Sequence, residues 1–332
     1  MLGLAIGGLA FASVSDEALA ADHGDTPALI AIPRHDARLS DLHVFTSGSN
    51  IVLALSTFPN LTGADYQFPA DLTLRFHVDN HSQISFGHAT DTARFGGTIV
   101  DPRNIGADIV LEVTFDDMGN PMLDAMGLGD RQAQDIELFA GVRDDPFIRG
   151  PQIGRNVASI VIELPLAHVL PPPTGAVRDE INRKLCERGM KNRDCSRPIL
   201  VWATSKVPDI AGTQAELAGR ALRSQCPQPI CNAVDGPDLN LRNETSPTKQ
   251  ARVLGIRPDV VIFDTSRPAG FPNGRLLTDD VVSIVAPFGQ NILANDYPCP
   301  AANDAPFLAG FPYLAPPHAD PPPILSGPAC ES

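Results

Sequence analysis

Proline is the residue type that most restricts how this chain can fold. The 332 residues include 32 prolines, about twice the usual share of roughly 5%. Each proline fixes φ and removes a backbone hydrogen-bond donor, so it interrupts helices and central strands. The sequence therefore favours many short strands joined by ordered loops over long helices.

Residues 71–80 carry the clearest strand signal. Leucine, phenylalanine or valine occupies the even positions from 72 to 78, and polar residues occupy the odd ones. This period of two predicts an antiparallel strand with one buried face. Other apolar runs predict strands at residues 39–45, 51–58, 107–115, 136–142, 157–166, 199–207, 259–263 and 281–286. Because no strand–helix–strand rhythm appears, we predict a mainly β fold with an antiparallel β-sandwich-like core.

Two segments depart from the strand pattern. Residues 171–250 begin with three prolines and then show helical spacing of apolar residues at 174–189 and 211–224. We interpret this segment as a small helical insertion at the edge of the core. Residues 298–332 are rich in proline and alanine and are predicted to form an extended arm that wraps the core. Residues 21–332 are thus expected to form a single domain.

The first 20 residues have the pattern of a secretory signal. Residues 2–14 are apolar and uncharged, and the small residues of ALA at 18–20 form a cleavage site before Ala21. The apolar run is shorter than the ~20 residues that cross a bilayer. We therefore expect a secreted or periplasmic mature chain without a membrane span. A noncleaved N-terminal anchor is the alternative.

The cysteines all follow this signal. An even number in an exported chain favours disulfides, here three. Sequence alone does not choose among the possible pairings, but proximity in the chain favours 186–195, 226–231 and 299–330. The insertion would then be pinned by disulfides. The six are Cys186, Cys195, Cys226, Cys231, Cys299 and Cys330.

The charge balance bears on partners. The formal net charge is −14 at pH 7, and a negative surface repels phosphate backbones. We therefore predict no nucleic-acid partner. A small molecule or a component of the cell envelope is the class of partner that remains.

An arginine and two adjacent carboxylates occur together at two points of the chain. The first stretch is FAGVRDDPF at residues 139–147 and the second is PNGRLLTDD at residues 272–280. A guanidinium can tie loop carbonyls and nearby carboxylates together, so we predict two structural polar corners. A site for a carboxylate or sulfate ligand is the alternative. The residues concerned are Arg143, Asp144, Asp145, Arg275, Asp279 and Asp280.

Histidines supply the sharpest signal for chemistry. His77, Asp79 and His81 would project from the same side of a strand, and two imidazoles with a carboxylate suit a divalent metal. His23 and His318 could complete such a site. Acidic pairs at residues 116–117, 144–145 and 279–280 offer the oxygen ligands that Ca²⁺ prefers. The cofactor could thus be Ca²⁺ or a transition metal. A solvated strand face and ordinary turn chemistry explain the same residues without any metal.

Several short motifs in a fixed order resemble a known family. They are DHGDTP at residues 22–27, DLHVF at 41–45, the two polar corners, GRNV at 154–157 and FPYLAPPH at 311–318. Together they resemble the bacterial exported proteins of domain-of-unknown-function family 4331 (DUF4331). The resemblance implies export and a β-rich fold. It supplies no catalytic residues, because the function of the family is itself unknown.

Three functional hypotheses follow. The sequence contains no Gly-x-Ser-x-Gly elbow, His-Glu-x-x-His motif or phosphate-binding loop, which favours a noncatalytic ligand-binding or envelope-associated β module. The first alternative is a metal-dependent periplasmic enzyme or metal-binding protein that uses His77, Asp79 and His81. The second is a hydrolase of an extracellular polymer that uses the acidic pairs as acid and base.

Overall fold

The computed structural model describes residues 26–129, 133–148, 154–170, 197–221, 244–285 and 302–320. Strands predominate over helices in these ranges, and the paired strands are antiparallel. The prediction of a mainly β, antiparallel fold is confirmed.

The first sheet follows the order β1–β2–β9–β8. Its central strands are almost entirely buried, because both of their faces are covered. Near-continuous apolar runs, such as residues 51–55 of β2, match this environment. The strands are β1 (Leu39–Ser47), β2 (Asn50–Leu61), β9 (Asn156–Pro165) and β8 (Glu137–Asp144).

The second sheet follows the order β11–β10–β3–β6–β7, and β12 also pairs with β10. Strands β3 and β6 of this sheet alternate between buried and half-exposed residues, as the period of two at residues 71–80 predicted for β3. A short pair, β4 (Ile84–Ser85) with β5 (Thr98–Ile99), lies at one end. The strands are β3 (Thr73–Asp79), β6 (Ile109–Phe115), β7 (Pro121–Met126), β10 (Pro198–Lys206), β11 (Glu216–Ala218) and β12 (Val261–Asp264).

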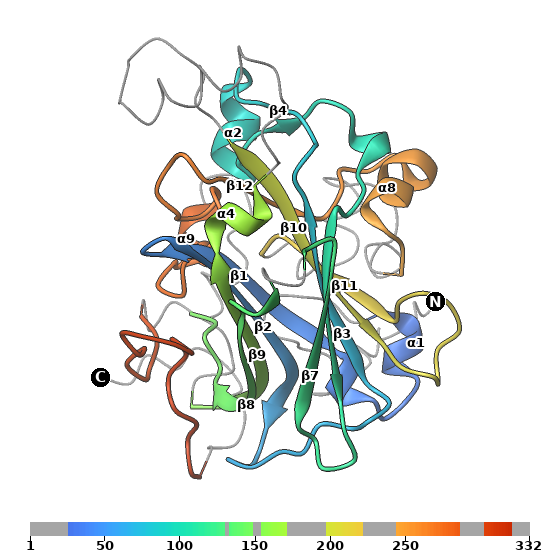
Figure 1. The fold of residues 1–332 in the computed structure, drawn as a ribbon, viewed down its shortest axis with the longest axis vertical. Coiled ribbons are helices and arrows are strands. Elements are labelled where there is room, and N and C mark those ends of the chain that lie inside the picture. The colour runs from blue at the N-terminus through green and yellow to red at the C-terminus, as the bar shows by residue number, and fades with distance from the viewer. Residues whose placement is uncertain are drawn as a thin grey trace, which may run out of the picture.

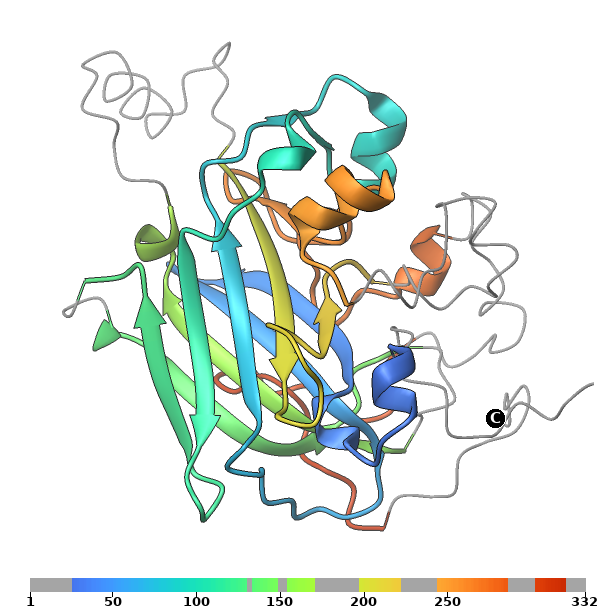
Figure 2. The same cartoon turned by 90° about the vertical axis from the view of Figure 1, so that its right-hand side faces the viewer.

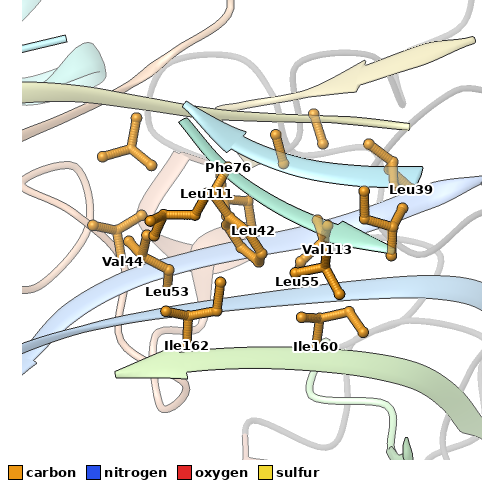
Figure 3. Close-up of a cluster of buried hydrophobic side chains, with 14 of the residues drawn as sticks. Leu39, Leu42, Val44, Leu53, Leu55, Phe76, Leu111, Val113, Ile160 and Ile162 are labelled. Carbon is orange, nitrogen blue, oxygen red and sulfur yellow. The ribbon is translucent and has the colours of Figure 1, made fainter. Parts of the chain in front are cut away.

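The two sheets face each other, with the strands of one crossing behind those of the other (Figures 1 and 2). Leu42, Leu53 and Ile162 of the first sheet pack against Phe76 and Leu111 of the second (Figure 3). None of these side chains is more than 1% exposed. Full burial of such a side chain contributes about 1.5–3 kcal/mol relative to exposure, so this interlayer core is the main source of stability.

The face of the first sheet that points away from this core is also covered. Phe45 and Val161 on that face pack in a cluster with Tyr313 and Leu314. The Tyr313 hydroxyl donates a 2.7 Å hydrogen bond to Glu163. Residues 302–320, part of the predicted arm, therefore lie against β1 and β9 as a third layer.

The helices in the described ranges are short. α9 corrects a prediction, because residues 281–286 were expected to form a strand. Asp280 caps the first turn by accepting hydrogen bonds from the Ser283 N–H and hydroxyl, and the valines at 281, 282 and 285 share the buried face. The elements are α1 (Pro27–Ile30), α2 (Ala89–Phe95), α4 (Leu166–Val169), α8 (Pro247–Lys249), α9 (Val281–Val285), the 3-10 turns η1 (His35–Ala37) and η2 (Pro102–Asn104), and the π turn η3 (Gln250–Leu254).

A second correction concerns residues 211–224, for which we predicted a helical patch. The described part of this range contains strand β11, which pairs with β10. Glu216 of β11 is fully buried and accepts hydrogen bonds from the backbone N–H groups of Leu39 (2.7 Å) and Thr26 (3.3 Å). These long-range bonds favour the strand over the local helical preference.

Several predictions fall outside the described residues. These are the signal at residues 1–20, the six cysteines with their pairing, the helical patch at 174–189 and His23. Within the described ranges, no helix combines the length and apolar character needed to cross a membrane.

Candidate functional site

The two predicted polar corners meet at strand β1. Arg275 pairs its backbone with Val44, whose carbonyl accepts the Arg275 N–H at 2.8 Å. Its guanidinium is 2% exposed and lies 2.6 Å from Asp41 Oδ1 and 5.9 Å from the Phe147 ring centroid. Gly274 makes this approach possible, since it has a φ of +71° and a Cβ there would lie 2.5 Å from the Val44 oxygen.

The other members of the corners have separate partners. Arg143 does not form the predicted tie to Asp144 and Asp145; its guanidinium instead lies 4.1 Å from the Phe139 ring centroid and donates to the Val142 carbonyl. Asp145 is buried and accepts a hydrogen bond from the Phe147 N–H. Burial and the nearby charge of Asp41 raise the pKa of Asp145.

The remaining acidic pairs serve as turn and helix caps. Asp279 accepts 2.7 Å hydrogen bonds from the N–H groups of Phe271 and Leu276, and Asp280 caps α9. Asp116 accepts from the side chain and N–H of Asn120 in the β6–β7 turn, and these bonds hold its pKa below the usual range. The carboxylates of Asp116, Asp279 and Asp280 are thus occupied by local donors, which does not suit an acid–base pair across a cleft.

The predicted histidine ladder does not assemble. His77 stacks on Trp202 with ring centroids 5.0 Å apart and contacts the Thr204 hydroxyl through Nε2. Burial, together with the charge of Arg75, lowers the pKa of His77 to about 4. β3 ends at Asp79, so His81 lies beyond the strand.

Asp79 and His81 instead form polar contacts with the loops at the end of β3. The Asp79 carboxylate accepts hydrogen bonds from the N–H groups of His81, Ser82 and Gly106. His81 Nδ1 lies 2.8 Å from Asp108 Oδ2, and this contact raises the pKa of His81. Asp79, His81 and Asp108 line an open pocket of about 450 Å³, together with Ser82, Gln83, Val100, Asp101, Asn104, Gly106 and Ala107.

A different set of side chains has the geometry of a metal site. Asp144, Asp304 and His318 each place one potential ligand atom within 4.8 Å of the others, and no other such group occurs in the described ranges. His318 Nε2 lies 2.7 Å from Asp144 Oδ1 and 3.4 Å from Asp304 Oδ2. The Asp144 side chain is fully buried, whereas those of Asp304 and His318 are 21% and 28% exposed. The group is therefore reachable from one side.

Neighbouring residues hold each of these groups in place. The Asn303 side chain donates to Asp144 Oδ2 at 2.6 Å, and the Gly154 N–H donates to Asp304 Oδ2 at 2.6 Å. Asn156 of β9 bonds both sides of the residue 318 backbone, accepting its N–H and donating to its carbonyl. Such outer contacts fix the orientation of metal ligands.

The electrostatics of the group favour a bound cation. Burial, followed by the charge of Asp304, raises the pKa of Asp144 to about 6, although Asn303 and His318 act in the opposite direction. Two carboxylates in so small a volume repel each other unless a proton or a metal ion lies between them.

The two histidine regions lie at opposite ends of strand β9. The Asn80 side chain, next to Asp79, donates to the Val169 carbonyl just beyond the last residue of β9. Asp144 and His318 instead contact Asn156, which is the first residue of β9. A strand of this length spans about 30 Å. His318 therefore does not complete a site with His77 and His81.

Sequence reasoning named Asp144 and His318 separately but missed Asp304. Asp304 follows an asparagine within a proline-rich segment, where a polar pair has the pattern of an ordinary turn. Only the path of residues 302–320 across the first sheet brings it to Asp144.

No family model and no curated protein matches this chain. The assignment of Asp144, Asp304 and His318 as a candidate metal site therefore depends on their geometry alone.

Proposed function

We propose that this chain is a noncatalytic, exported β-sandwich module that binds a divalent transition-metal ion through Asp144, Asp304 and His318. The convergence of two carboxylates and an imidazole within 4.8 Å carries the proposal. The signal-like residues 1–20 and the resemblance to family DUF4331 support export.

The ligand set suits a transition metal better than Ca²⁺. Ca²⁺ takes six to eight oxygen ligands, whereas imidazole with carboxylates suits Zn²⁺, Mn²⁺ or Fe²⁺. The sequence left both Ca²⁺ and a transition metal open as the bound ion. The imidazole nitrogen of His318 favours the transition metal.

The contacts of His318 favour binding over catalysis. A histidine that activates a serine, threonine or cysteine nucleophile faces the hydroxyl or thiol of that residue. His318 Nε2 instead faces the carboxylates of Asp144 and Asp304. This arrangement can hold a cation, and residues 302–320 would then be fastened to the first sheet by the ion.

Metal stoichiometry tests the proposal. The full chain is stripped with chelator, dialysed against Zn²⁺ or Mn²⁺ and assayed by elemental analysis. We expect about one ion per chain in the natural protein, and loss of most of it in H318N and D304N. H81N is the matched control, because it alters a histidine–aspartate contact at the other end of β9. Retention of the ion by H318N and its loss from H81N would overturn the proposal.

The pocket at Asp79, His81 and Asp108 supports a second candidate function, the binding of a small molecule. It is concave, and its lining of carboxylates, imidazole and amide groups offers convergent hydrogen-bonding groups. A screen of small polar compounds by ligand-observed NMR would test this function. Binding that persists in a D108N/H81N variant would place the ligand elsewhere.

A further inference from the structure

The pocket beyond the end of strand β3 is formed by two loops. One loop follows β3 and contributes lining residues from 79 to 83; the other precedes β6 and contributes lining residues from 100 to 108. In Figure 1 these loops belong to the upper end of the molecule, where β4 lies. The volume of about 450 Å³ falls within the range of about 300–1,000 Å³ that is typical of small-molecule sites.

The Asp79 side chain holds the two loops together. Its Oδ1 accepts the N–H groups of His81 and Ser82, and its Oδ2 accepts the Ser82 hydroxyl and the N–H of Gly106 on the other loop. Asp79 is 2% exposed, so this connection lies at the base of the pocket. A site that is fixed in this way loses little conformational entropy when a ligand binds.

The charges that line the pocket favour a cation. Asp79, Asp101 and Asp108 each contribute a carboxylate. Among the described residues that line it, none is lysine or arginine, and His81 is the one side chain that can carry a positive charge. Even with His81 protonated, the lining carboxylates outnumber the lining cations by three to one. The net charge of −14 adds a long-range attraction for positively charged molecules.

Asp101 and Asp108 retain acceptor atoms for a ligand. Asp101 precedes η2 without capping it, and its carboxylate has no hydrogen bond or ion pair within the described part of the chain. Asp108 uses Oδ2 to accept the Asn80 N–H and to contact His81. Its Oδ1 has no such contact with the described residues. These two carboxylates can therefore accept hydrogen bonds from a bound molecule.

The spacing of the carboxylates disfavours a single metal ion. In the described ranges, the one group of three ligand atoms within 4.8 Å of one another is that of Asp144, Asp304 and His318. The carboxylates of the pocket do not form a second such group. An organic cation can instead place an ammonium group at the carboxylates and extend across the rest of the pocket, where Gln83 and Asn104 offer carboxamides.

We propose that this pocket binds an organic amine through a primary ammonium group that donates to Asp101 and Asp108. The inference rests on the small-molecule function proposed above for the same pocket, and it names the class of ligand. An ammonium group has three donors and no acceptor, and its hydrogen bonds to carboxylates are roughly twice as strong as those between neutral groups. The side chain of Val100, which is 58% exposed at the pocket, offers an apolar contact for the carbon skeleton.

Titration calorimetry with the full chain at fixed ionic strength tests the ammonium group directly. Glucosamine and putrescine are the amines. N-acetylglucosamine, in which a neutral amide replaces the ammonium group, and the diol with the same carbon chain as putrescine are their neutral counterparts. We expect saturable binding of an amine, with its counterpart at least tenfold weaker. Tighter binding of glucosamine would indicate an amino sugar as the natural source, and tighter binding of putrescine an aliphatic polyamine.

Two results would overturn the inference in different ways. Equal affinity for an amine and its neutral counterpart would show that the ammonium group is not recognised, although the small-molecule function of the pocket would stand. Absence of saturable binding by both amines would remove the amine as the ligand class, and the small-molecule function would then be decided by the NMR screen described above.

Variants separate binding in the pocket from general charge effects. D101N and D108N should each weaken binding of the preferred amine at least tenfold. D117N is the matched control for D101N, because both carboxylates are exposed but Asp117 follows the other end of β6. D101N removes no contact with the described residues, so it should fold as the natural protein does, which thermal unfolding checks. Equal losses of affinity in D101N and D117N would overturn the assignment of the amine to this pocket.

Discussion

His318 Nε2 lies 2.7 Å from Asp144 Oδ1, although the two residues are 174 positions apart in the chain. This contact ties the segment that covers the outer face of the first sheet to the end of strand β8. The same segment contributes Asp304 and Asn303 to the group. A metal at this point would therefore join two layers of the fold, and its binding and the docking of residues 302–320 should depend on each other.

The raised pKa of Asp144 predicts a pH dependence of stability in the metal-free protein. Its pKa is about 6 in the folded chain against 3.8 in the unfolded one, so the folded state binds the proton more tightly. This contribution is fully present below about pH 3.8 and is lost as the pH rises through about 6. Its size is on the order of 3 kcal/mol. Urea unfolding in chelator at pH 4 to 7 should show this loss, and D144N should not.

The same proton competes with the metal. Metal affinity should therefore fall steeply as the pH drops below about 6, since a protonated carboxyl is a poor ligand. D117N, which changes an exposed turn carboxylate, is the control for both measurements. Identical pH profiles for D144N and the natural protein would contradict the role given to Asp144.

His77 should show the opposite pH dependence. Its pKa is lowered from 6.5 to about 4, so the unfolded chain takes up its proton first. The stability that His77 contributes is present above about pH 6.5 and is lost as the pH falls through about 4. An NMR titration of the His77 ring should give a midpoint near 4. His77→Phe keeps a ring against Trp202 but should remove this dependence, whereas His81→Phe should not. A midpoint for His77 near 6.5 would show that its ring is solvated.

The Arg275–Asp41 pair predicts a large effect of a single substitution. Arg275→Met leaves the buried Asp41 without this partner and should lower the free energy of unfolding by about 3–5 kcal/mol. The double variant D41N/R275M should lose less, because no uncompensated charge remains. Arg267→Met breaks the more exposed pair with Asp264 and should cost about 1 kcal/mol or less. Denaturant unfolding of the three variants measures these differences. Equal losses for Arg275→Met and Arg267→Met would refute the structural role of the corner.

The sequence predicted the strands better than the helices, for a physical reason. Strand β3 could be predicted because its alternating pattern matches one covered face. The valines of α9 form an equally apolar run, but the cap at Asp280 and burial on one side of the segment favour a helix. Strand β7 was missed, since its outward residues Met122 and Met126 are exposed and blur the alternation.

The candidate site was less predictable than the fold. His77, Asp79 and His81 form a regular pattern, yet Asp79 is used to hold the turn that follows β3, which draws His81 away from the strand. Asp144, Asp304 and His318 show no regular spacing. They come together only because residues 302–320 cross the outer face of the first sheet, and no local sequence pattern encodes that path.

Anomalous diffraction is the most direct test of the metal site. Crystals grown with Mn²⁺ or Zn²⁺ would be measured at the absorption edge of the ion. We predict an anomalous peak about 2.0–2.3 Å from a carboxylate oxygen of Asp144, a carboxylate oxygen of Asp304 and Nε2 of His318. A saturating ion that gives no peak there, or a peak beside Asp79, His81 and Asp108 instead, would contradict the account.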